Sequence, residues 1–418
     1  MGIGPGTLVS EVGRIGAPLS NRGALVAQLD HVLLRGDAAA GHLLPTAGNR
    51  FELLEGTDAF LGRMLDDFRG ATDQINFTTY GLDPLVKDGR VQRVITELRN
   101  AAARDVKVTG IVDQVGGGTL LPNSATRGRR LVYSQLREAG VDIREKPVSF
   151  TRAGLNDKRF AVDHRKLYEI DGRISYQGGI NLVDSWMPWH DMMIRTEGPA
   201  AAQGGALIAA RWQEVGGTVS QARRDILAAG LRAPVDDARH MAWQLSNGNR
   251  ARRELTEAFV EDARTAQHRL WITNPYLADE NVMQEVVKAA ERGVDVRLTL
   301  SPKAGGSEQS QDWFTDPLRR AWASRIAEAG GTVHVLPEFS HAKAWIKDDI
   351  ANVGSFNLDR GSTIRNYENS IRTTDPHALL SLEQLFRGQH ARAMQATTDT
   401  VAGWRSVERF QRLTGFQY

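Results

Sequence analysis

An internal repeat constrains the fold of this chain more than any other feature. Four segments of the first half recur in the second half in the same order, and the first half carries an insertion before the third segment: Gly140 to His164 is 24 residues, whereas Gly330 to His341 is 11. The matched pairs are AAARDVKV (101–108) with AAERGVDV (289–296), LREAGVDI (136–143) with IAEAGGTV (326–333), DHRKLYEIDGRISYQGGINL (163–182) with SHAKAWIKDDIANVGSFNL (340–358), and HDMMIRTEGP (190–199) with YENSIRTTDP (367–376). Self-similarity of this extent indicates two copies of one structural unit.

The repeated segments also indicate what each unit contains. The first pair reads as a helix end followed by a buried strand, over Val106–Val112 in one copy and Val294–Leu300 in the other. The second pair adds a helix, a glycine stop and a further strand. The third pair reads as two strands joined by a tight turn. We therefore predict an α/β fold of two similar lobes, each a mixed β-sheet flanked by helices, packed about a pseudo-twofold axis.

The repeat boundaries divide the chain into four parts. Residues 1–49 match nothing in the second half and form an N-terminal extension, followed by a first lobe at 50–215, a linker at 216–250 and a second lobe at 251–418. The extension contains an amphipathic helix near 22–35. Its apolar face fits packing against the core or docking on a membrane, and the sequence leaves both open.

Composition limits the chemistry and the partners. The 418 residues include no cysteine, which excludes disulfides, thiolate catalysis and cysteine-bound zinc. The formal net charge is only +2, which permits an anionic substrate without indicating a nucleic-acid coat. With neither an 18-residue apolar run nor a secretory signal at the start, we expect a cytoplasmic or peripheral membrane protein, with an exported form left open.

The third repeated segment carries a His-x-Lys pair in each copy. Side chains two residues apart on a strand point to the same face, so His164 projects with Lys166, and His341 with Lys343. Asn181 and Asn357 follow one hairpin later and are expected to reach the same place. If the lobes meet at this face, two imidazoles, two ammonium groups and two amides surround one phosphate.

Two histidines in such a site favour covalent catalysis of phosphodiester cleavage. One attacks phosphorus, while the other protonates the leaving alcohol and then deprotonates the acceptor. Asp191 lies 27 residues after His164, and Glu368 lies 27 residues after His341, so we expect each acid to orient a histidine. Spacing does not decide which acid serves which ring. Asp171 and Asp348 sit at the hairpin turns, as turn formers or as supporting residues.

These residues resemble the duplicated HKD motif of the phospholipase D superfamily. The first copy reads H-R-K-x4-D-x6-G-G-I-N (164–181), and the second reads H-A-K-x4-D-x5-G-S-F-N (341–357), one residue shorter. Within the superfamily, phrases such as WHDMMIRTEGPAA (189–201) and SFNLDRGS (355–362) look most like bacterial cardiolipin synthases. The resemblance implies that His164 is the nucleophile and His341 the acid, without a metal or other cofactor. We also expect Gly179 and Ser355 of the motif to contact the substrate.

The resemblance implies a lipid phosphodiesterase or phosphatidyltransferase, with a phospholipid at a membrane surface as substrate. Because one chain holds both motifs, no obligate dimer is expected. A nuclease of the same superfamily is the alternative; low net charge and an aromatic content of 7% argue against it. A non-catalytic binding module is a third possibility, opposed by two intact motifs. Trp186, Trp189 and Trp345 lie near the motifs, either lining a substrate channel or packed in the core.

Overall fold

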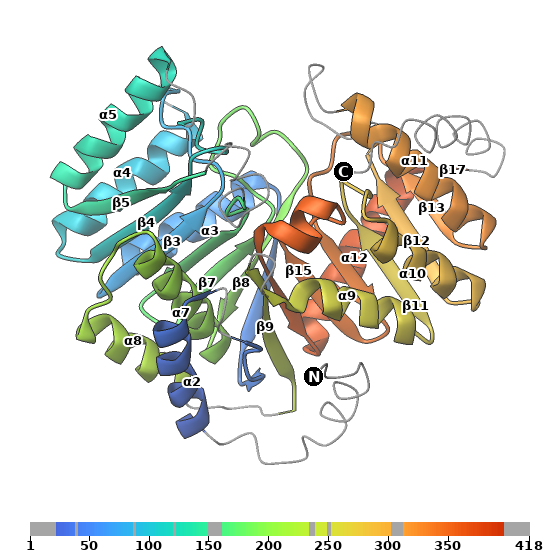
Figure 1. Cartoon of the computed structure of the whole chain (residues 1–418), viewed down its shortest axis with the longest axis horizontal. Coiled ribbons are helices and arrows are strands. Elements are labelled where there is room, and N and C mark those ends of the chain that lie inside the picture. Colours follow the sequence, from blue (N-terminus) through green and yellow to red (C-terminus); the bar gives the residue numbers. More distant parts are fainter. Residues whose placement is uncertain are drawn as a thin grey trace.

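The computed structural model describes residues 22–37, 41–86, 89–119, 123–148, 161–233, 239–248, 252–301 and 312–396. Two mixed β-sheets stand next to each other, and helices cover both faces of each (Figure 1). Successive stretches of the chain build one sheet and then the other, apart from a short N-terminal strand that joins the second sheet.

The first lobe holds a seven-stranded sheet in the order β2-β8-β7-β6-β3-β4-β5. Its strands are β2 (Arg50–Glu55), β3 (Gln74–Thr79), β4 (Lys107–Asp113), β5 (Val141–Lys146), β6 (Lys166–Ile170), β7 (Ile174–Gly178) and β8 (Met192–Glu197). Its helices are α3 (Thr57–Gly70), α4 (Arg90–Ala103), α5 (Ser124–Glu138) and α7 (Pro199–Glu214). The small, apolar sequence of α7 is buried from Pro199 to Trp212.

The second lobe holds a ten-stranded sheet in the order β1-β9-β16-β15-β14-β11-β12-β13-β17, with β10 paired to β9. The strands are β1 (Thr46–Ala47), β9 (Met241–Gly248), β10 (Arg252–Arg253), β11 (Arg269–Thr273), β12 (Asp295–Leu300), β13 (Thr332–Val335), β14 (Ala344–Lys347), β15 (Ile350–Gly354), β16 (Tyr367–Thr373) and β17 (Met394–Ala396). The helices are α9 (Glu254–Thr265), α10 (Glu280–Glu291), α11 (Asp312–Glu328), α12 (Pro376–Arg392) and the single-turn π-helix η3 (Gly361–Arg365).

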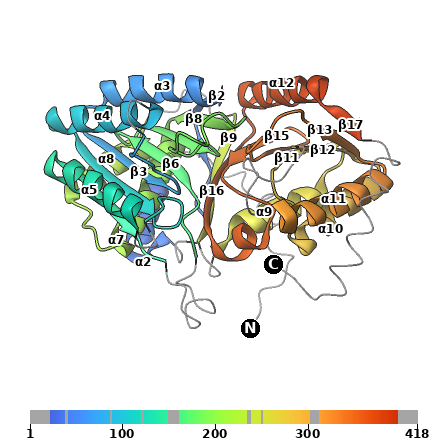
Figure 2. The same cartoon turned by 90° about the horizontal axis from the view of Figure 1, so that it is seen from above.

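The two sheets share one topology. The run β2-β8-β7-β6-β3-β4-β5 in the first lobe corresponds to β9-β16-β15-β14-β11-β12-β13 in the second. Contacts between the lobes repeat in the same way, because Asp163 bridges Tyr367 while its counterpart Ser340 bridges His190. In Figure 2, α3 and α4 lie on the same side of the molecule as α12, while α7 lies on the side of α9. By position in the repeat, α3 is equivalent to α9, and α7 is equivalent to α12. Equivalent helices therefore lie on opposite sides of the molecule, as a two-fold relation requires. The predicted fold of two similar lobes is confirmed.

Side-chain hydrogen bonds cap the N-termini of several of these helices. Asn123 accepts from the backbone N–H of Thr126 at the start of α5, at 2.8 Å. Asp279 and Asp375 accept from the first turns of α10 and α12. Asn and Asp are favoured at this position because their side chains satisfy backbone donors that the helix leaves unpaired. The caps mark where each strand-to-helix connection ends.

An apolar cluster joins the lobes. It combines Met192, Ile194 and Ala200 of the first lobe with strand residues of the second lobe and with Leu382, Leu385 and Phe386 of α12. Each lobe also has its own core between its sheet and its first helices. Because burial of apolar area is the main stabilising contribution, the shared cluster fixes the lobes against each other.

The two segments outside the repeat are integrated into the fold. In the N-terminal extension, α2 (Arg22–Arg35) buries Leu29, Val32 and Leu33 in a cluster with α7 and α8 (Gln221–Leu231), and β1 pairs with β9. Packing is therefore the role of the α2 apolar face. The expected linker, 216–250, contains α8 and β9. We propose that the second lobe begins at β9, since β9 occupies the position of β2.

No helix within the described ranges is both long and apolar enough to span a membrane.

Candidate active site

The two His-x-Lys pairs meet at the boundary between the lobes. His164 lies just before β6 and His341 just before β14, at equivalent strand ends. The backbone N–H of His164 donates to the carbonyl of Tyr367 at 2.9 Å, and that of His341 donates to the carbonyl of His190 at 2.7 Å. Each histidine is thus held by the strand entry of the opposite lobe.

The acids pair across the lobes. His341 Nδ1 lies 2.8 Å from Asp191 Oδ2, and His164 Nδ1 lies 3.0 Å from Glu368 Oε1. Each acid therefore contacts the histidine of the other repeat, which answers the question that the equal spacing left open. A carboxylate at Nδ1 favours the tautomer that carries its proton there, so Nε2 is the ring nitrogen left for chemistry.

The lysines are buried next to the histidines. Lys166 Nζ donates to the carbonyl of His164 at 2.6 Å, and Lys343 Nζ donates to that of His341. Burial lowers the pKa of Lys166 to about 8 and holds that of Lys343 well below its usual range. Nearby carboxylates, Glu368 and Asp191, oppose this shift. A bound anion would favour the charged ammonium forms further.

Both histidines have a pKa below the ordinary value, mainly because they are buried. The pKa of His341 falls to about 3. The lysine of each motif lowers the pKa of the histidine in the other motif as well as its own. The two motifs therefore share one electrostatic environment, as a single site requires.

The surroundings of the two acids differ. Ser355 and Ser362 donate hydroxyl hydrogen bonds to Glu368, the latter at 2.6 Å. Burial works to raise the pKa of Glu368, but His164 and Lys166 outweigh it and the pKa is lowered. In the first lobe, a Cβ added at Gly179 would come within 2.1 Å of Asp191 Oδ1. Gly179 and Ser355, predicted as substrate contacts, thus lie against the acids.

Asn181 and Asn357 are both about 5% exposed. Within the described chain, the Oδ1 atom of each is buried without a hydrogen-bond partner. Buried amide groups are normally satisfied, so a ligand is the natural partner for this position. A 180° rotation of the amide, which exchanges its oxygen and nitrogen, would present the NH₂ group to a phosphoryl oxygen.

The motif aspartates lie away from the histidines. Asp171 accepts from the backbone N–H groups of Asp73 and Gln74, at 2.9 and 2.8 Å, and Asp348 accepts from those of His268 and Arg269 in the same way. Both have left-handed backbone angles, with φ of 53° and 48°. Their role in the structure is to hold the chain entering β3 and β11.

An aromatic row connects the two histidines. Tyr80 meets His164 edge-on at 4.9 Å and stacks on Trp186, which stacks on Trp189 at 5.6 Å. Trp189 lies 5.5 Å from the ring of His341. Trp345, by contrast, is buried in the second core and donates to Asp262 at 2.8 Å.

Sequence reasoning missed Tyr80 and Ser362. Tyr80 directly follows β3, and its position at the carboxyl end of a parallel strand was an available signal. The ring of His190 contacts neither catalytic histidine: its Nδ1 lies 3.1 Å from Ser340 Oγ and its Nε2 lies 2.8 Å from Glu55 Oε1. Among the residues that the structure describes, no group of three or more His, Asp or Glu side chains is placed to hold a metal ion.

Comparison with known proteins agrees with this geometry. Duplicated lobes with one shared pair of histidines define a phospholipase D-like fold. A family described as "Cardiolipin synthase, PLD-like domain" matches residues 64–206 and 259–389. The matched segments comprise more than half of the chain, which therefore belongs to this family, and the predicted resemblance is confirmed.

Individual relatives fit the same family. The chain is 26% identical over 347 residues to cardiolipin synthase A of Pectobacterium atrosepticum, covering 78% of this chain and 66% of that protein. It is 27% identical over 360 residues to cardiolipin synthase A of Pseudomonas syringae pv. syringae, covering 82% and 69%. The match to the Pseudomonas fluorescens enzyme is 27% over 396 residues, covering 91% and 76%. The chain thus spans about two thirds to three quarters of the length of these relatives.

Solved structures support the fold. Phosphatidylserine synthase of Haemophilus influenzae superimposes with a TM-score of 0.65 at 13% identity, covering 93% of this chain and 98% of that one. Polyphosphate kinase of Porphyromonas gingivalis gives a TM-score of 0.53 at 14% identity, covering 84% and 49%. At these identities the likeness concerns the fold alone.

Proposed function

We propose that the protein is a phospholipase D-type phosphatidyltransferase or phosphodiesterase that acts on glycerophospholipids through a phosphohistidine. The observation that carries the proposal is the reciprocal pairing of His164 with Glu368 and of His341 with Asp191 across the lobes, at 3.0 and 2.8 Å. Such pairs favour the tautomer with the proton on Nδ1 in both rings and leave both Nε2 atoms available for nucleophilic and acid–base chemistry.

The first half-reaction forms the covalent intermediate. His164 Nε2 attacks phosphorus, the bond to the leaving alcohol breaks, and His341 gives that alkoxide a proton from Nε2. Lys166 and Lys343, with the two asparagine amides, stabilise the negative charge that grows on the phosphoryl oxygens. Glu368 stabilises the positive charge that develops on the ring of His164.

The second half-reaction reverses these roles. His341 takes the proton from the acceptor, the acceptor oxygen attacks phosphorus, and the bond to His164 breaks. Water as acceptor gives hydrolysis, and an alcohol gives transfer to a new headgroup. Burial lowers the pKa of His341 to about 3, so its role as an acid requires that the substrate raise this pKa. A negative phosphodiester next to the two lysines favours that protonation.

Relatives support the choice of substrate. The curated proteins reported above are named cardiolipin synthases, and the family carries the same name. The nuclease alternative gains no support from these relatives. Its requirement for strong phosphate-backbone attraction is also poorly met by a net charge of +2.

We propose further that the first lobe contacts the lipid surface near α5. Leu85, Val86 and Leu131 are 38%, 46% and 59% exposed. Leu85 reaches Gly128 of α5, one helical turn before Leu131, and Arg127 beside them is exposed. Apolar side chains next to an exposed arginine suit an anionic bilayer surface. This contact would place the protein at the membrane periphery.

Product analysis tests the proposal. We would incubate the protein with phosphatidylglycerol vesicles, with and without added primary alcohol, and identify the products by mass. Phosphatidyl transfer to the alcohol, or to a second phosphatidylglycerol, is the expected result. His164→Ala should abolish it. Single-stranded DNA serves as the competing substrate, and cleavage of DNA without any lipid turnover would overturn the proposal.

A substrate with an activated leaving group separates the two histidines. A p-nitrophenyl phosphodiester releases its phenolate without help from an acid. His341→Ala should therefore still release one equivalent of p-nitrophenolate rapidly and then stall with the remaining alkyl phosphoryl group bound covalently to the protein, visible by intact mass. If His164→Ala gives this burst instead, the roles of the two histidines are exchanged.

A further inference from the structure

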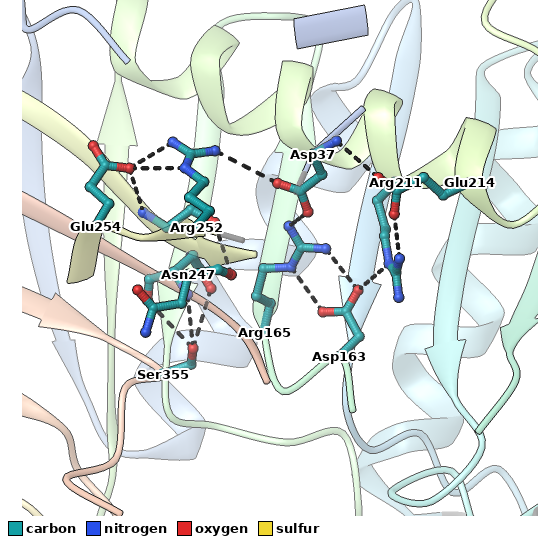
Figure 3. A network of polar contacts seen from close by, with 11 residues as sticks. Asp37, Asp163, Arg165, Arg211, Glu214, Asn247, Arg252, Glu254 and Ser355 are labelled. Carbon is teal, nitrogen blue, oxygen red and sulfur yellow. Dashed lines mark hydrogen bonds and ion pairs between the residues drawn. The ribbon is translucent and has the colours of Figure 1, made fainter. Parts of the chain in front are cut away.

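A buried network of alternating charges lies next to the first His-x-Lys motif (Figure 3). Arg165, between His164 and Lys166, donates to Asp37 Oδ2 at 2.6 Å and to both oxygens of Asp163 at 2.8 Å. Arg211 Nε donates to Asp163 at 3.1 Å. Asp37, Asp163 and Arg165 are fully buried. Because side chains of successive residues in extended backbone point to opposite faces, Asp163 and Arg165 point away from the face of His164, and the charge network lies on their face.

The charge network connects three parts of the molecule. Asp37 comes from the segment after α2, which has no counterpart in the repeat. Its other oxygen, Oδ1, lies 3.8 Å from Arg252 of the second lobe, and Arg252 pairs with Glu254 at 2.6 Å. The backbone N–H of Asp37 also donates to Glu214 of α7 at 2.9 Å. Asp37 is thus the point at which the segment after α2 and both lobes meet.

The same charges support the catalytic pair on both sides. Asp163 and Arg165 are the residues directly before and after His164. Tyr367, directly before Glu368, has Arg211 over its ring at 3.9 Å and Arg165 at 5.3 Å. The relative position of His164 and Glu368 is therefore set by neighbours that all belong to, or pack on, this network.

The positions of the second motif that correspond to Asp163 and Arg165 carry no charge. Ala342 stands where the first motif has Arg165, and it is buried in the apolar cluster between the lobes. Ser340 stands where the first motif has Asp163, and it exchanges neutral hydrogen bonds with Ser301 at 2.7 and 3.0 Å. The repeat alone therefore does not require the charges. A role specific to the first histidine would account for these charges.

We propose that Asp37 is a positioning residue for His164, acting through Arg165, so that the segment after α2 contributes to the active site. The inference rests on the proposed function, because it gives His164 the role of the attacking group. A buried guanidinium that loses one of two carboxylates is strongly destabilised and moves toward its remaining partners. Any such movement of Arg165 displaces the adjacent histidine, and small displacements of a nucleophile are costly to the rate.

A double-mutant cycle tests the proposal. The variants are Asp37→Asn, which keeps the size of the side chain, Arg165→Ala, and the two combined. Asp37→Asn should lower kcat about tenfold or more with KM nearly unchanged, because a displaced nucleophile weakens the transition state and not substrate binding. In the Arg165→Ala background, the same change should have little further effect.

A matched control separates positioning from stability. Asp67 of α3 forms a less deeply buried ion pair with Arg195 of the first lobe, at 2.6 Å. Asp67→Asn should lower the free energy of unfolding while kcat remains that of the original protein. Arg165→Lys keeps the charge but cannot pair in the plane of two carboxylates, and should reproduce the loss of kcat even if Asp37→Asn folds poorly.

Nuclear magnetic resonance of ¹⁵N-labelled histidine gives a readout that is independent of turnover. In Asp37→Asn, the His164 Nδ1–H signal should weaken and its titration should shift to lower pH, since contact with Glu368 is loosened. An unchanged titration together with unchanged kcat would overturn the proposal. If the original protein shows no lipid turnover while the titration still shifts, the positioning inference stands and the proposed function fails.

Discussion

Replacing Asp171 with alanine should destabilise the protein without slowing catalysis, although this residue is the aspartate of the first HKD motif. Its carboxylate accepts from the backbone N–H groups of Thr72, Asp73 and Gln74 at 2.8–2.9 Å. A hydrogen bond to a charged group contributes at least about 1.5 kcal/mol when it is shielded, as that from Gln74 is, and solvent replaces most of the two exposed ones. Loss of the residue's tolerance for a positive φ adds about 1 kcal/mol. The expected total is about 3 kcal/mol.

Urea unfolding and kinetics together check this prediction. The midpoint of unfolding should fall, whereas kcat of the folded protein should not change, because Asp171 lies five residues along β6 from Lys166. At the rise of a strand this is roughly 16 Å. Asp171→Asn keeps one carbonyl acceptor and tolerates a positive φ, so it should lose less stability. A tenfold fall in kcat at an unchanged urea midpoint would refute the reasoning, since it would require a catalytic role at that distance.

Two substitutions and one binding measurement test the site itself. His164→Ala should leave no phosphatidyl transfer above background in the vesicle assay, and near-normal rates would remove it as the nucleophile. Gly179→Ser, which copies the second motif, should lower kcat, because the added Cβ would meet Asp191 Oδ1 at 2.1 Å and push it from His341; unchanged kinetics would show that this carboxylate can yield. Dimethyl phosphate should bind with uptake of a proton and more tightly as pH falls, because the anion raises the pKa of His341 from about 3. Calorimetry in two buffers of different ionisation enthalpy measures the uptake, and none would be seen if His341 stayed neutral.

The repeat made the fold predictable from the sequence. The strands expected at Val106–Val112 and Val294–Leu300 occur as β4 and β12, and both hairpins after the lysines form with their turns at Asp171 and Asp348. Local patterns decide these elements, because short runs of strand-forming residues bounded by turn residues span only a few positions. The neighbouring Asp349, by contrast, has a side chain that is 94% exposed, so Asp348 is the counterpart of Asp171.

Contacts between the lobes could not be read from local patterns. Equal spacing from histidine to acid showed that Asp191 and Glu368 occupy equivalent positions, but equivalence is preserved whether each acid serves its own lobe or the other. Only the strand bridges across the boundary, such as His190 with Ser340, decide for the exchanged arrangement. The pairing of Asp37 with Arg165 had no sequence signal either, since the two residues are 128 positions apart.

Trp345 lies on the same strand face as Lys343 but outside the site. It lies two residues after Lys343 and shares its face of the strand, yet it packs against Phe259 in the core. Tyr168, two residues after Lys166, packs against Phe60 in the same way. The site occupies only the strand ends, and one step further along each strand the same face is covered by the first helix of its lobe. Residues that share a face therefore share a site only at the edge of the sheet.

A duplicated site must also break its symmetry, because its two histidines need opposite protonation states during each half-reaction. The two copies differ where this can be achieved. Glu368 receives hydroxyl hydrogen bonds from Ser355 and Ser362, with no equivalent at Asp191 among the residues that the structure describes, and Arg165 brings buried charge to one motif where the other has an apolar Ala342. Each difference stabilises a fixed geometry or a charge on the His164 side. The asymmetry is consistent with the proposal that His164 is the ring that carries the covalent bond.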